Sequence, residues 1–188
     1  MKTVIQMLIT LTIIGVISGG LLSEISKWAD PQIAEHRKEE TAKAIYLVQP
    51  SAKSYEAITE VGFEVYKVFD ENKNQIGFAL PYEGNGFQGK VRLMVGLNND
   101  LNEVIGLQVL EQLETPGLGT KITEEPFLKQ FLNLSTLPQV DWVKGAPPSN
   151  PNEIQTITGA TISSKAVVTI LNDGIKKLRE ANNSGGAK

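Results

Sequence analysis

A short run of hydroxyl-bearing and small residues near the carboxyl end of the chain has the composition of an anion site. Residues 158–164 read TGATISS and stand directly before an amphipathic stretch, with Lys165 following them. The first N–H groups of a helix lack partners and the helix dipole favours negative charge, so a phosphate would be stabilised there. Gly159 and Ala160 leave room for a bulky group. The segment therefore predicts a phosphate held either as a ligand or as an ester of Thr161.

The same residues also suit a purely structural role. Serine and threonine are favoured at helix N-caps, and Ser163 or Ser164 is expected to cap the helix that follows. A capped helix preceded by a turn of small residues would need no ligand.

Two glycine-rich segments are candidates for contact with such a ligand. Residues 82–89 (YEGNGFQG) carry three glycines within six residues, between two predicted strands. Glycine lets a backbone approach a flat ligand closely, although a bulged sheet corner needs the same residues. Residues 114–119 (ETPGLG) contain a Pro-Gly pair typical of a type II turn, followed by an apolar side chain, Leu118, between two glycines. This second segment is interpreted equally as a turn or as a ligand contact.

The composition excludes several kinds of chemistry. The 188 residues include no cysteine and one histidine, His36. Disulfides, iron–sulfur clusters, thiolate zinc sites and cysteine nucleophiles are therefore ruled out, and a Ser-His-Asp triad would depend on His36 alone. The net charge of −3 argues against a nucleic-acid partner, because binding the phosphate backbone needs a basic face. We assign no catalytic residue and no metal ligand. Any chemistry must use hydroxyls, carboxylates, amines or a group brought from outside.

The elements that would position these segments follow strand and helix patterns. Residues 61–69 and 75–80 are rich in β-forming residues and flank the turn sequence DENKN, and residues 90–97 and 104–113 flank NNDLN. These two hairpins predict an antiparallel sheet of at least four strands. Flanking helices are predicted over residues 124–131 and over residues 165–180, where apolar side chains recur at helical spacing. The fold class is therefore α+β.

The first segment of the chain has the composition of a membrane span. Residues 3–23 carry no charge, and residues 4–22 are long enough, at about 1.5 Å per residue, to cross a hydrocarbon core of about 30 Å. A cleaved signal peptide is the competing interpretation, but Ser18-Gly19-Gly20 is a poor cleavage site. A lipoprotein anchor is excluded because no cysteine is present. Basic residues flank both ends of the span, so the charges do not settle its orientation.

We expect four regions along the chain. Residues 1–23 form the transmembrane anchor, and residues 24–60 form a juxtamembrane segment with an amphipathic helix over residues 31–45. The charged run HRKEE within that helix is interpreted as a solvated face. Residues 61–180 form the main domain, and residues 181–188 form a disordered tail.

Together these features resemble the FMN-binding G subunit of the Rnf electron-transport complex. The resemblance covers essentially the whole chain: the N-terminal span, the glycine-rich loop followed by VRLMVGL, ETPGLGTKI, and TGATISS before a helix. The C subunit of the sodium-translocating NADH:quinone reductase is a close relative of that family. In the family the last threonine of [Ser/Thr]-Gly-Ala-Thr is esterified by the phosphate of FMN, which a flavin transferase attaches. The resemblance therefore implies that Thr161 carries FMN covalently. This chain departs from the pattern at Gln155, where the family usually has an acidic residue.

The resemblance also implies roles for neighbouring residues. The segment from Glu114 to Gly119 would line the isoalloxazine ring, with Leu118 on its face, while Lys165 and Lys144 would balance the charge of the phosphate. Three aromatic side chains near these segments, Tyr82, Phe87 and Trp142, are expected to pack in the core rather than to shield the ring. The implied cofactor-binding residues are Thr161, Thr158, Gly159, Ala160, Ile162, Ser163, Lys165, Glu114, Thr115, Gly117, Leu118, Gly119 and Lys144.

The implied function is electron relay. The chain would be a flavoprotein component of a complex that moves electrons between ferredoxin and NAD and exports sodium ions or protons. Its partners would be the membrane, iron–sulfur and flavin subunits of that complex. It would be a single-pass protein of the bacterial cytoplasmic membrane, with the flavin domain on the extracytoplasmic side. Two alternatives stay open: the C subunit of the quinone reductase, and a non-enzymatic binding module tethered to the membrane.

Overall fold

The computed structural model describes residues 2–58 and 62–185 of the chain. The chain divides into two compact units, one ending at Glu40 and one beginning at Thr41. Helix α1 (Lys2–Val48) contributes to both, because its last residues belong to the second unit. The expected domain start at residue 61 therefore lies inside the second unit, since the end of α1 supplies part of its core.

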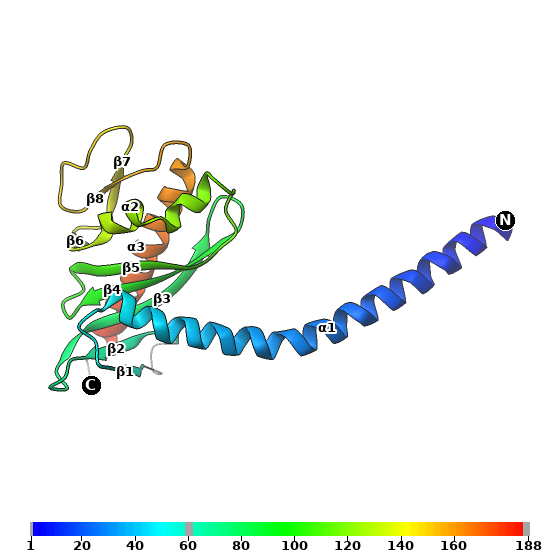
Figure 1. The fold of residues 1–188 in the computed structure, drawn as a ribbon, viewed down its shortest axis with the longest axis horizontal. Helices are drawn as coiled ribbons and strands as arrows, with labels where there is room; N and C mark the ends of the chain where they lie inside the picture. Colours follow the sequence, from blue (N-terminus) through cyan, green and yellow to red (C-terminus); the bar gives the residue numbers. More distant parts are fainter. Residues whose placement is uncertain (1, 59–61, 186–188) are drawn as a thin grey trace. The chain divides into compact units, whose positions relative to one another are not determined.

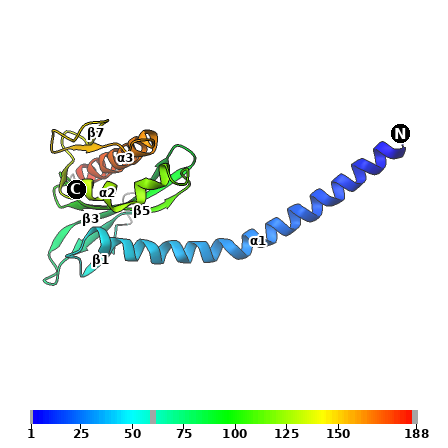
Figure 2. The ribbon, with the colours of Figure 1, turned by 45° about the horizontal axis from the view of Figure 1, so that its top comes forward.

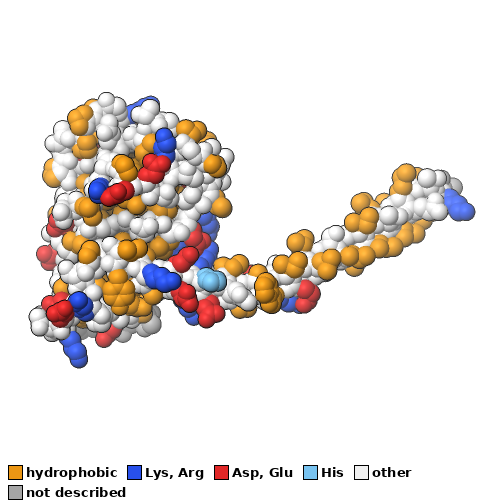
Figure 3. Space-filling model, in the orientation of Figure 1, with side chains coloured by type: hydrophobic (Ala, Val, Ile, Leu, Met, Phe, Trp, Pro, Cys, Tyr) orange, Lys and Arg blue, Asp and Glu red, His pale blue; other side chains and the backbone are white. Residues whose placement is uncertain are grey.

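Helix α1 is continuous over 47 residues and contains Pro31. The separate helix predicted over residues 31–45 is therefore wrong in its boundaries. A proline removes one backbone hydrogen bond, and the strong helix formers that follow it allow the helix to continue. Among the described residues, α1 is the one helix long and apolar enough to cross a membrane, with a mean hydropathy of 2.1 over its apolar part. Figure 3 shows exposed apolar side chains along this part of the helix.

In the described residues, six strands form the main sheet, in the order β1-β2-β3-β4-β5-β6, and all neighbours are antiparallel. Both predicted hairpins are confirmed, since β2 pairs with β3 and β4 pairs with β5. Strand β3 continues to Asn85, so the first residues of the predicted glycine-rich loop are strand that pairs with β4. Val61, where the first strand was expected to begin, lies outside the described residues. The strands are β1 (Ser54–Ala57), β2 (Tyr66–Phe69), β3 (Gln75–Asn85), β4 (Lys90–Asn98), β5 (Glu103–Gln112) and β6 (Leu134–Ser135), with β7 (Asp141–Val143) and β8 (Glu153–Gln155) as a separate parallel pair.

Side chains alternate across the sheet and build a core on each face. On β4, Leu93 and Val95 belong to the larger core cluster, which includes the apolar face of helix α3 (Thr161–Gly185). Met94, between them, belongs to the smaller cluster with Ile45 and Val48 at the end of α1. Successive residues of a strand point to opposite faces, so β4 is buried on both. Figures 1 and 2 show α3 on one face of the sheet and the end of α1 on the other.

Glycines let the end of α1 lie close to the sheet. Gly96 on β4 pairs with Gly106 on β5. A Cβ added to Gly96 would stand 2.3 Å from the carbonyl oxygen of Val48, and one added to Gly106 would stand 2.8 Å from it. Directly after the helix, the side-chain amide of Gln49 donates a hydrogen bond to the carbonyl oxygen of Leu97 at 2.8 Å. The end of α1 is thus fixed against the middle of the sheet.

The first residue of the second unit is also held by the sheet. The guanidinium of Arg92 donates a hydrogen bond to Thr41 Oγ1 at 3.0 Å. The same guanidinium lies 3.5 Å from a carboxylate oxygen of Glu64 and 3.3 Å from one of Glu111, and the Arg92 side chain is only 11% exposed. A buried guanidinium requires such partners, and here they include the point where α1 enters the unit.

The remaining helices lie where the sequence predicted them, but their ends differ. Residues 124–131 contain α2 (Glu125–Leu128) and the 3₁₀ turn η2 (Lys129–Phe131), and the turn η1 (Gly119–Thr123) precedes them. Helix α3 begins at Thr161 rather than at residue 165 and continues to Gly185. The predicted disordered tail is therefore wrong up to residue 185, because each residue added to a packed helix gains a hydrogen bond. Residues 186–188 lie outside the described part of the chain.

Candidate functional site

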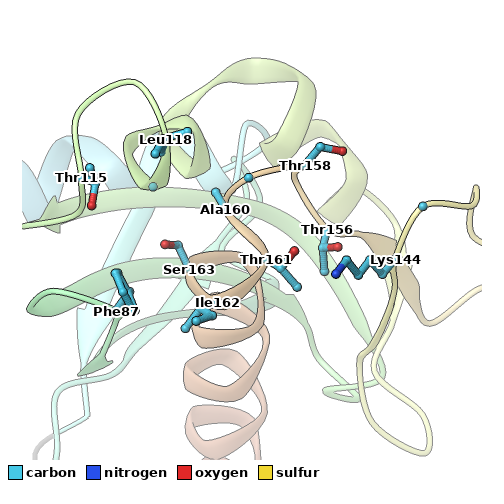
Figure 4. A pocket seen from close by; sticks show the side chains of 13 residues that line it. Phe87, Thr115, Leu118, Lys144, Thr156, Thr158, Ala160, Thr161, Ile162 and Ser163 are labelled. Carbon is cyan, nitrogen blue, oxygen red and sulfur yellow. The ribbon is translucent and has the colours of Figure 1, made fainter.

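A cavity of about 590 Å³ lies where the start of α3 meets the loop after β5 and the loop after β7. This volume falls in the range of about 300–1,000 Å³ that is usual for sites of small molecules and cofactors. Figure 4 shows the side chains that line it. Among the described residues that line the cavity, Lys144 is the one with a charged side chain. The lining residues are Phe87, Thr115, Leu118, Gly119, Lys144, Gly145, Thr156, Thr158, Gly159, Ala160, Thr161, Ile162 and Ser163.

The start of α3 forms one wall of the cavity. Thr161 is the first residue of the helix, and the N–H of Ser164 donates to the carbonyl oxygen of Ala160 at 3.0 Å, which closes the first turn. The N–H groups of residues 161–163 precede this bond and have no carbonyl one turn earlier. They and the helix dipole therefore favour an anion beside the Thr161 side chain.

The predicted cap at Ser163 or Ser164 is wrong, because both residues lie inside the first turn. The Ser164 hydroxyl donates to the carbonyl oxygen of Ala160 and accepts from the N–H of Ile157, both at 3.0 Å. It thereby holds the turn that leads into the helix. The Ser163 hydroxyl instead donates to Glu114 Oε2 at 2.7 Å.

Glu114 joins the three segments that the sequence singled out. Its side chain is 4% exposed, and Oε1 accepts a hydrogen bond from the N–H of Phe87 at 2.6 Å while Oε2 accepts the one from Ser163. A buried carboxylate is stable only with donors of this kind. Glu114 was expected on the ring of the cofactor, but it does not line the cavity. It holds the loop after β3 and the start of α3 against the end of β5.

The loop after β5 brings an apolar side chain to the cavity. The type II turn predicted at Pro-Gly is confirmed, since Gly117 has a φ of +74° and the N–H of Leu118 donates to the carbonyl oxygen of Thr115 at 3.2 Å. Leu118 is 48% exposed and lines the cavity. Its Cδ2 would stand 3.4 Å from a Cβ at Gly159, whose φ of +85° favours glycine. The two motifs, far apart in the sequence, therefore meet at Leu118 and Gly159.

Thr156 and Lys144 lie with Thr161 at the other side of the cavity (Figure 4). The N–H of Thr156 donates to the carbonyl oxygen of Val143 at 2.9 Å, which extends the pairing of β7 and β8. Its hydroxyl oxygen is buried and is the one such side-chain atom in the described residues with no hydrogen-bond partner. No sequence signal selects Thr156, because a β-branched residue after a strand is common.

Ten of the predicted cofactor-binding residues meet at the cavity, and three do not line it. Glu114 and Gly117 lie outside the lining, and the Lys165 ammonium lies 3.6 Å from the ring centroid of Trp142, in a cation–π contact. The ten residues at the cavity are Thr115, Leu118, Gly119, Lys144, Thr158, Gly159, Ala160, Thr161, Ile162 and Ser163.

The aromatic side chains divide between the core and the cavity. Tyr82 and Trp142 are partly buried against the larger core cluster, as predicted. The prediction that Phe87 packs in the core is wrong, because Phe87 is 59% exposed and lines the cavity. The residue follows the end of β3, where its N–H is held by Glu114 and its ring is left outside the core. Gly145, which also lines the cavity, was not selected from the sequence.

The fold and this cavity define a cofactor-binding α+β domain that follows an apolar N-terminal helix, and residues 86–176 match the FMN-binding domain family. The chain is 30% identical to the G subunit of the ion-translocating oxidoreductase complex of Methanosarcina acetivorans, over 93% of this chain and 94% of that protein. It is 33% identical to the G subunit of the Na⁺-translocating ferredoxin:NAD⁺ oxidoreductase complex of Acetobacterium woodii, over 74% and 70%. The chain belongs to the family of Rnf-type G subunits of ion-translocating oxidoreductase complexes.

A solved structure shares the fold. The C subunit of the Na⁺-translocating NADH-quinone reductase from Parabacteroides distasonis superposes with a TM-score of 0.60 at 18% identity, over 78% of this chain and 94% of that one. At this identity the likeness concerns the fold, and the family assignment comes from the G-subunit relatives.

Proposed function

We propose that this chain binds FMN covalently through Thr161 and relays electrons within an ion-translocating ferredoxin:NAD oxidoreductase. The observation that carries the proposal is the position of Thr161, whose hydroxyl stands at the first residue of α3 inside a cavity of cofactor size. The matching FMN-binding domain and the two G-subunit relatives support the same cofactor and the same complex.

The lining of the cavity fits the two chemically different ends of FMN. At the phosphate end, the Thr161 hydroxyl, the free N–H groups of the first helical turn and the Lys144 ammonium suit a phosphoester and its charge. At the ring end, Leu118, Phe87 and Ile162 expose large apolar surfaces, which a flat aromatic system would cover. We assign the phosphate to the first group and the isoalloxazine to the second.

The chain needs to hold and tune the cofactor rather than to react itself. FMN accepts and releases one or two electrons, which is chemistry that no side chain of this cysteine-free chain supplies. A bond through Thr161 keeps the cofactor in place even when its affinity differs between oxidation states. Leu118 lines the cavity from a turn that is closed by its own hydrogen bond to Thr115 and preceded by Glu114, which bonds to Ser163 at the start of α3. The isoalloxazine ring would therefore keep a constant environment.

The setting of the protein forms the second part of the proposal. The apolar part of α1 would anchor the chain as a single span in the bacterial cytoplasmic membrane, with the flavin domain on the extracytoplasmic side. Electrons would pass to and from the iron–sulfur and flavin subunits of the complex, which exports sodium ions or protons. A flavin transferase would attach FMN to Thr161.

In-gel fluorescence tests the attachment directly. The full chain, produced together with a flavin transferase, is denatured, separated on a gel and viewed under ultraviolet light. We expect a fluorescent band for the wild type and none for Thr161→Ala. Thr169→Ala is the matched control, because Thr169 is an exposed residue of the same helix outside the cavity. A dark wild-type band, or fluorescence that survives Thr161→Ala, would overturn the covalent assignment.

A further inference from the structure

The buried hydroxyl of Thr156 needs a partner that the protein does not provide. Thr156 is 5% exposed, and its Oγ1 makes no hydrogen bond within the part of the chain that the structure describes. A buried hydroxyl without a partner is costly, because it loses its hydrogen bonds to water and gains none. Such an atom in a residue that lines a cavity is available to donate to a group that binds there.

The backbone around Thr156 places its side chain at the cavity. The N–H of Thr156 donates to the carbonyl oxygen of Val143 at 2.9 Å, and two residues later the chain turns into the segment that starts α3. The side chain therefore lies at the cavity together with those of Thr161 and Lys144, as Figure 4 shows. A hydroxyl can donate one hydrogen bond, and a phosphate oxygen is a strong acceptor.

We propose that the Thr156 hydroxyl donates a hydrogen bond to a phosphate oxygen of FMN and fixes that phosphate beside Lys144. This inference rests on the proposed function, since it takes FMN as the occupant of the cavity. It adds a binding residue that no motif marks and gives the otherwise unpartnered hydroxyl its acceptor.

A second hollow, of about 330 Å³, is also lined by Thr156, but it suits an anion less well. Its lining includes the carboxylate-bearing Glu124 together with Lys121, whereas Lys144 is the one charged group among the described residues that line the cavity at Thr161. A like-charged carboxylate disfavours phosphate. We therefore assign the Thr156 hydroxyl to the cavity at Thr161.

Binding of two flavins to the full chain separates the phosphate contact from other roles of Thr156. The chain is produced without flavin transferase and kept in detergent, and FMN and riboflavin are titrated by flavin fluorescence. Thr156→Val replaces the hydroxyl by a methyl group of similar size, and Thr156→Ser retains it. We expect Thr156→Val to bind FMN about 10-fold more weakly while riboflavin affinity is unchanged, because only FMN carries the phosphate. Thr156→Ser should bind FMN about as the wild type does.

The thermal stability of the same flavin-free proteins gives an independent readout. Since the hydroxyl has no partner in the empty site, Thr156→Val should melt at the wild-type temperature or above it. A clear fall in melting temperature for Thr156→Val would mean that the hydroxyl supports the fold, and it would overturn the inference. Equal loss of affinity for FMN and riboflavin, or no loss for either, would overturn it as well.

Phosphorus NMR of the flavin-loaded chain tests the contact where it is proposed to form. The ³¹P resonance of the attached phosphate should shift in Thr156→Val and stay near the wild-type position in Thr156→Ser. An unchanged resonance in Thr156→Val would refute the contact while the attachment to Thr161 still stands. A wild-type chain that carries no flavin at all would instead refute the proposed function.

Discussion

Replacing Glu114 by alanine is expected to loosen the cavity and destabilise the domain. The carboxylate, 4% exposed, accepts hydrogen bonds from the N–H of Phe87 at 2.6 Å and from the hydroxyl of Ser163 at 2.7 Å. Hydrogen bonds to a charged group contribute about 1.5–3 kcal/mol each, and the desolvation of the carboxylate offsets part of this gain. With the lower value for each, the loss is about 3 kcal/mol.

This loss corresponds to a measurable change in melting temperature. For a domain of this size, about 2–4 °C is lost for each kcal/mol, so Glu114→Ala should melt about 10 °C below the wild type. The assay is thermal denaturation of the full chain in detergent, followed by circular dichroism. Glu114→Gln keeps the shape and one acceptor oxygen, so its melting temperature should fall less. Flavin attachment should decline in the same order, because Glu114 holds the start of α3 against the loop after β5.

Glu56→Ala is the matched control, because Glu56 is an exposed carboxylate on β1. Surface substitutions usually change the free energy of unfolding by less than about 0.5 kcal/mol, so this variant should melt within about 2 °C of the wild type. If Glu114→Ala also melts within about 2 °C of the wild type, the bridging role assigned to Glu114 is incorrect.

Two further changes test the ring contact and the loop that carries Lys144. Leu118→Ala should leave flavin attachment intact but shift the midpoint potential by about 20 mV for each kcal/mol by which the contact differs between oxidised and reduced flavin. The control is Leu132→Ala, at a residue that is 51% exposed and away from the cavity, and it should leave the potential unchanged. If the redox titration of Leu118→Ala is also unchanged, the loop after β5 has a structural role only. Hydrogen bonds from Ser149 and Asn150 hold the pKa of the Glu153 carboxyl below its ordinary value of 4.5, so their stabilising effect is present above that pH and is lost as the pH falls through the lowered pKa. Melting temperatures from about pH 6 to about pH 3 should therefore fall less steeply for Glu153→Gln than for the wild type, and equal slopes would contradict the contribution of this carboxyl.

The main hairpins were predictable because their signals are local. Alternating side chains and polar turns locate β4 and β5 to within a residue or two of their true ends. The short strands β1, β6, β7 and β8 were not predicted, because two to four residues carry no periodicity and each strand forms only when its partner is present. The end of α3 was predicted too early, because the residues after 180 are mostly polar and show no apolar spacing. They are helical because they extend a helix that the packing of its earlier residues already stabilises.

The candidate site was predictable where a motif marks it and not where tertiary contacts build it. Thr161 and Leu118 belong to recognisable glycine-containing segments, and both line the cavity. Glu114 lies in such a segment too, but only the folded chain shows that it joins three segments rather than facing the cavity. Phe87 and Thr156 depend on where the ends of β3 and β8 lie in space, and neither position can be read from the residues around them.

The end of α1 limits where the junction of a chimera between this protein and a relative can be placed. Residues from Thr41 onward, including Ile45 and Val48, complete the core on one face of the sheet, and the glycine pair Gly96–Gly106 leaves room for that helical end. A hybrid joined near residue 61 would keep those glycines but lose the helix they accommodate, and Met94 would face water. Natural or engineered recombination that supplies a different anchor must therefore make its junction before Thr41. A junction placed there keeps the last two turns of α1 together with the sheet that they cover.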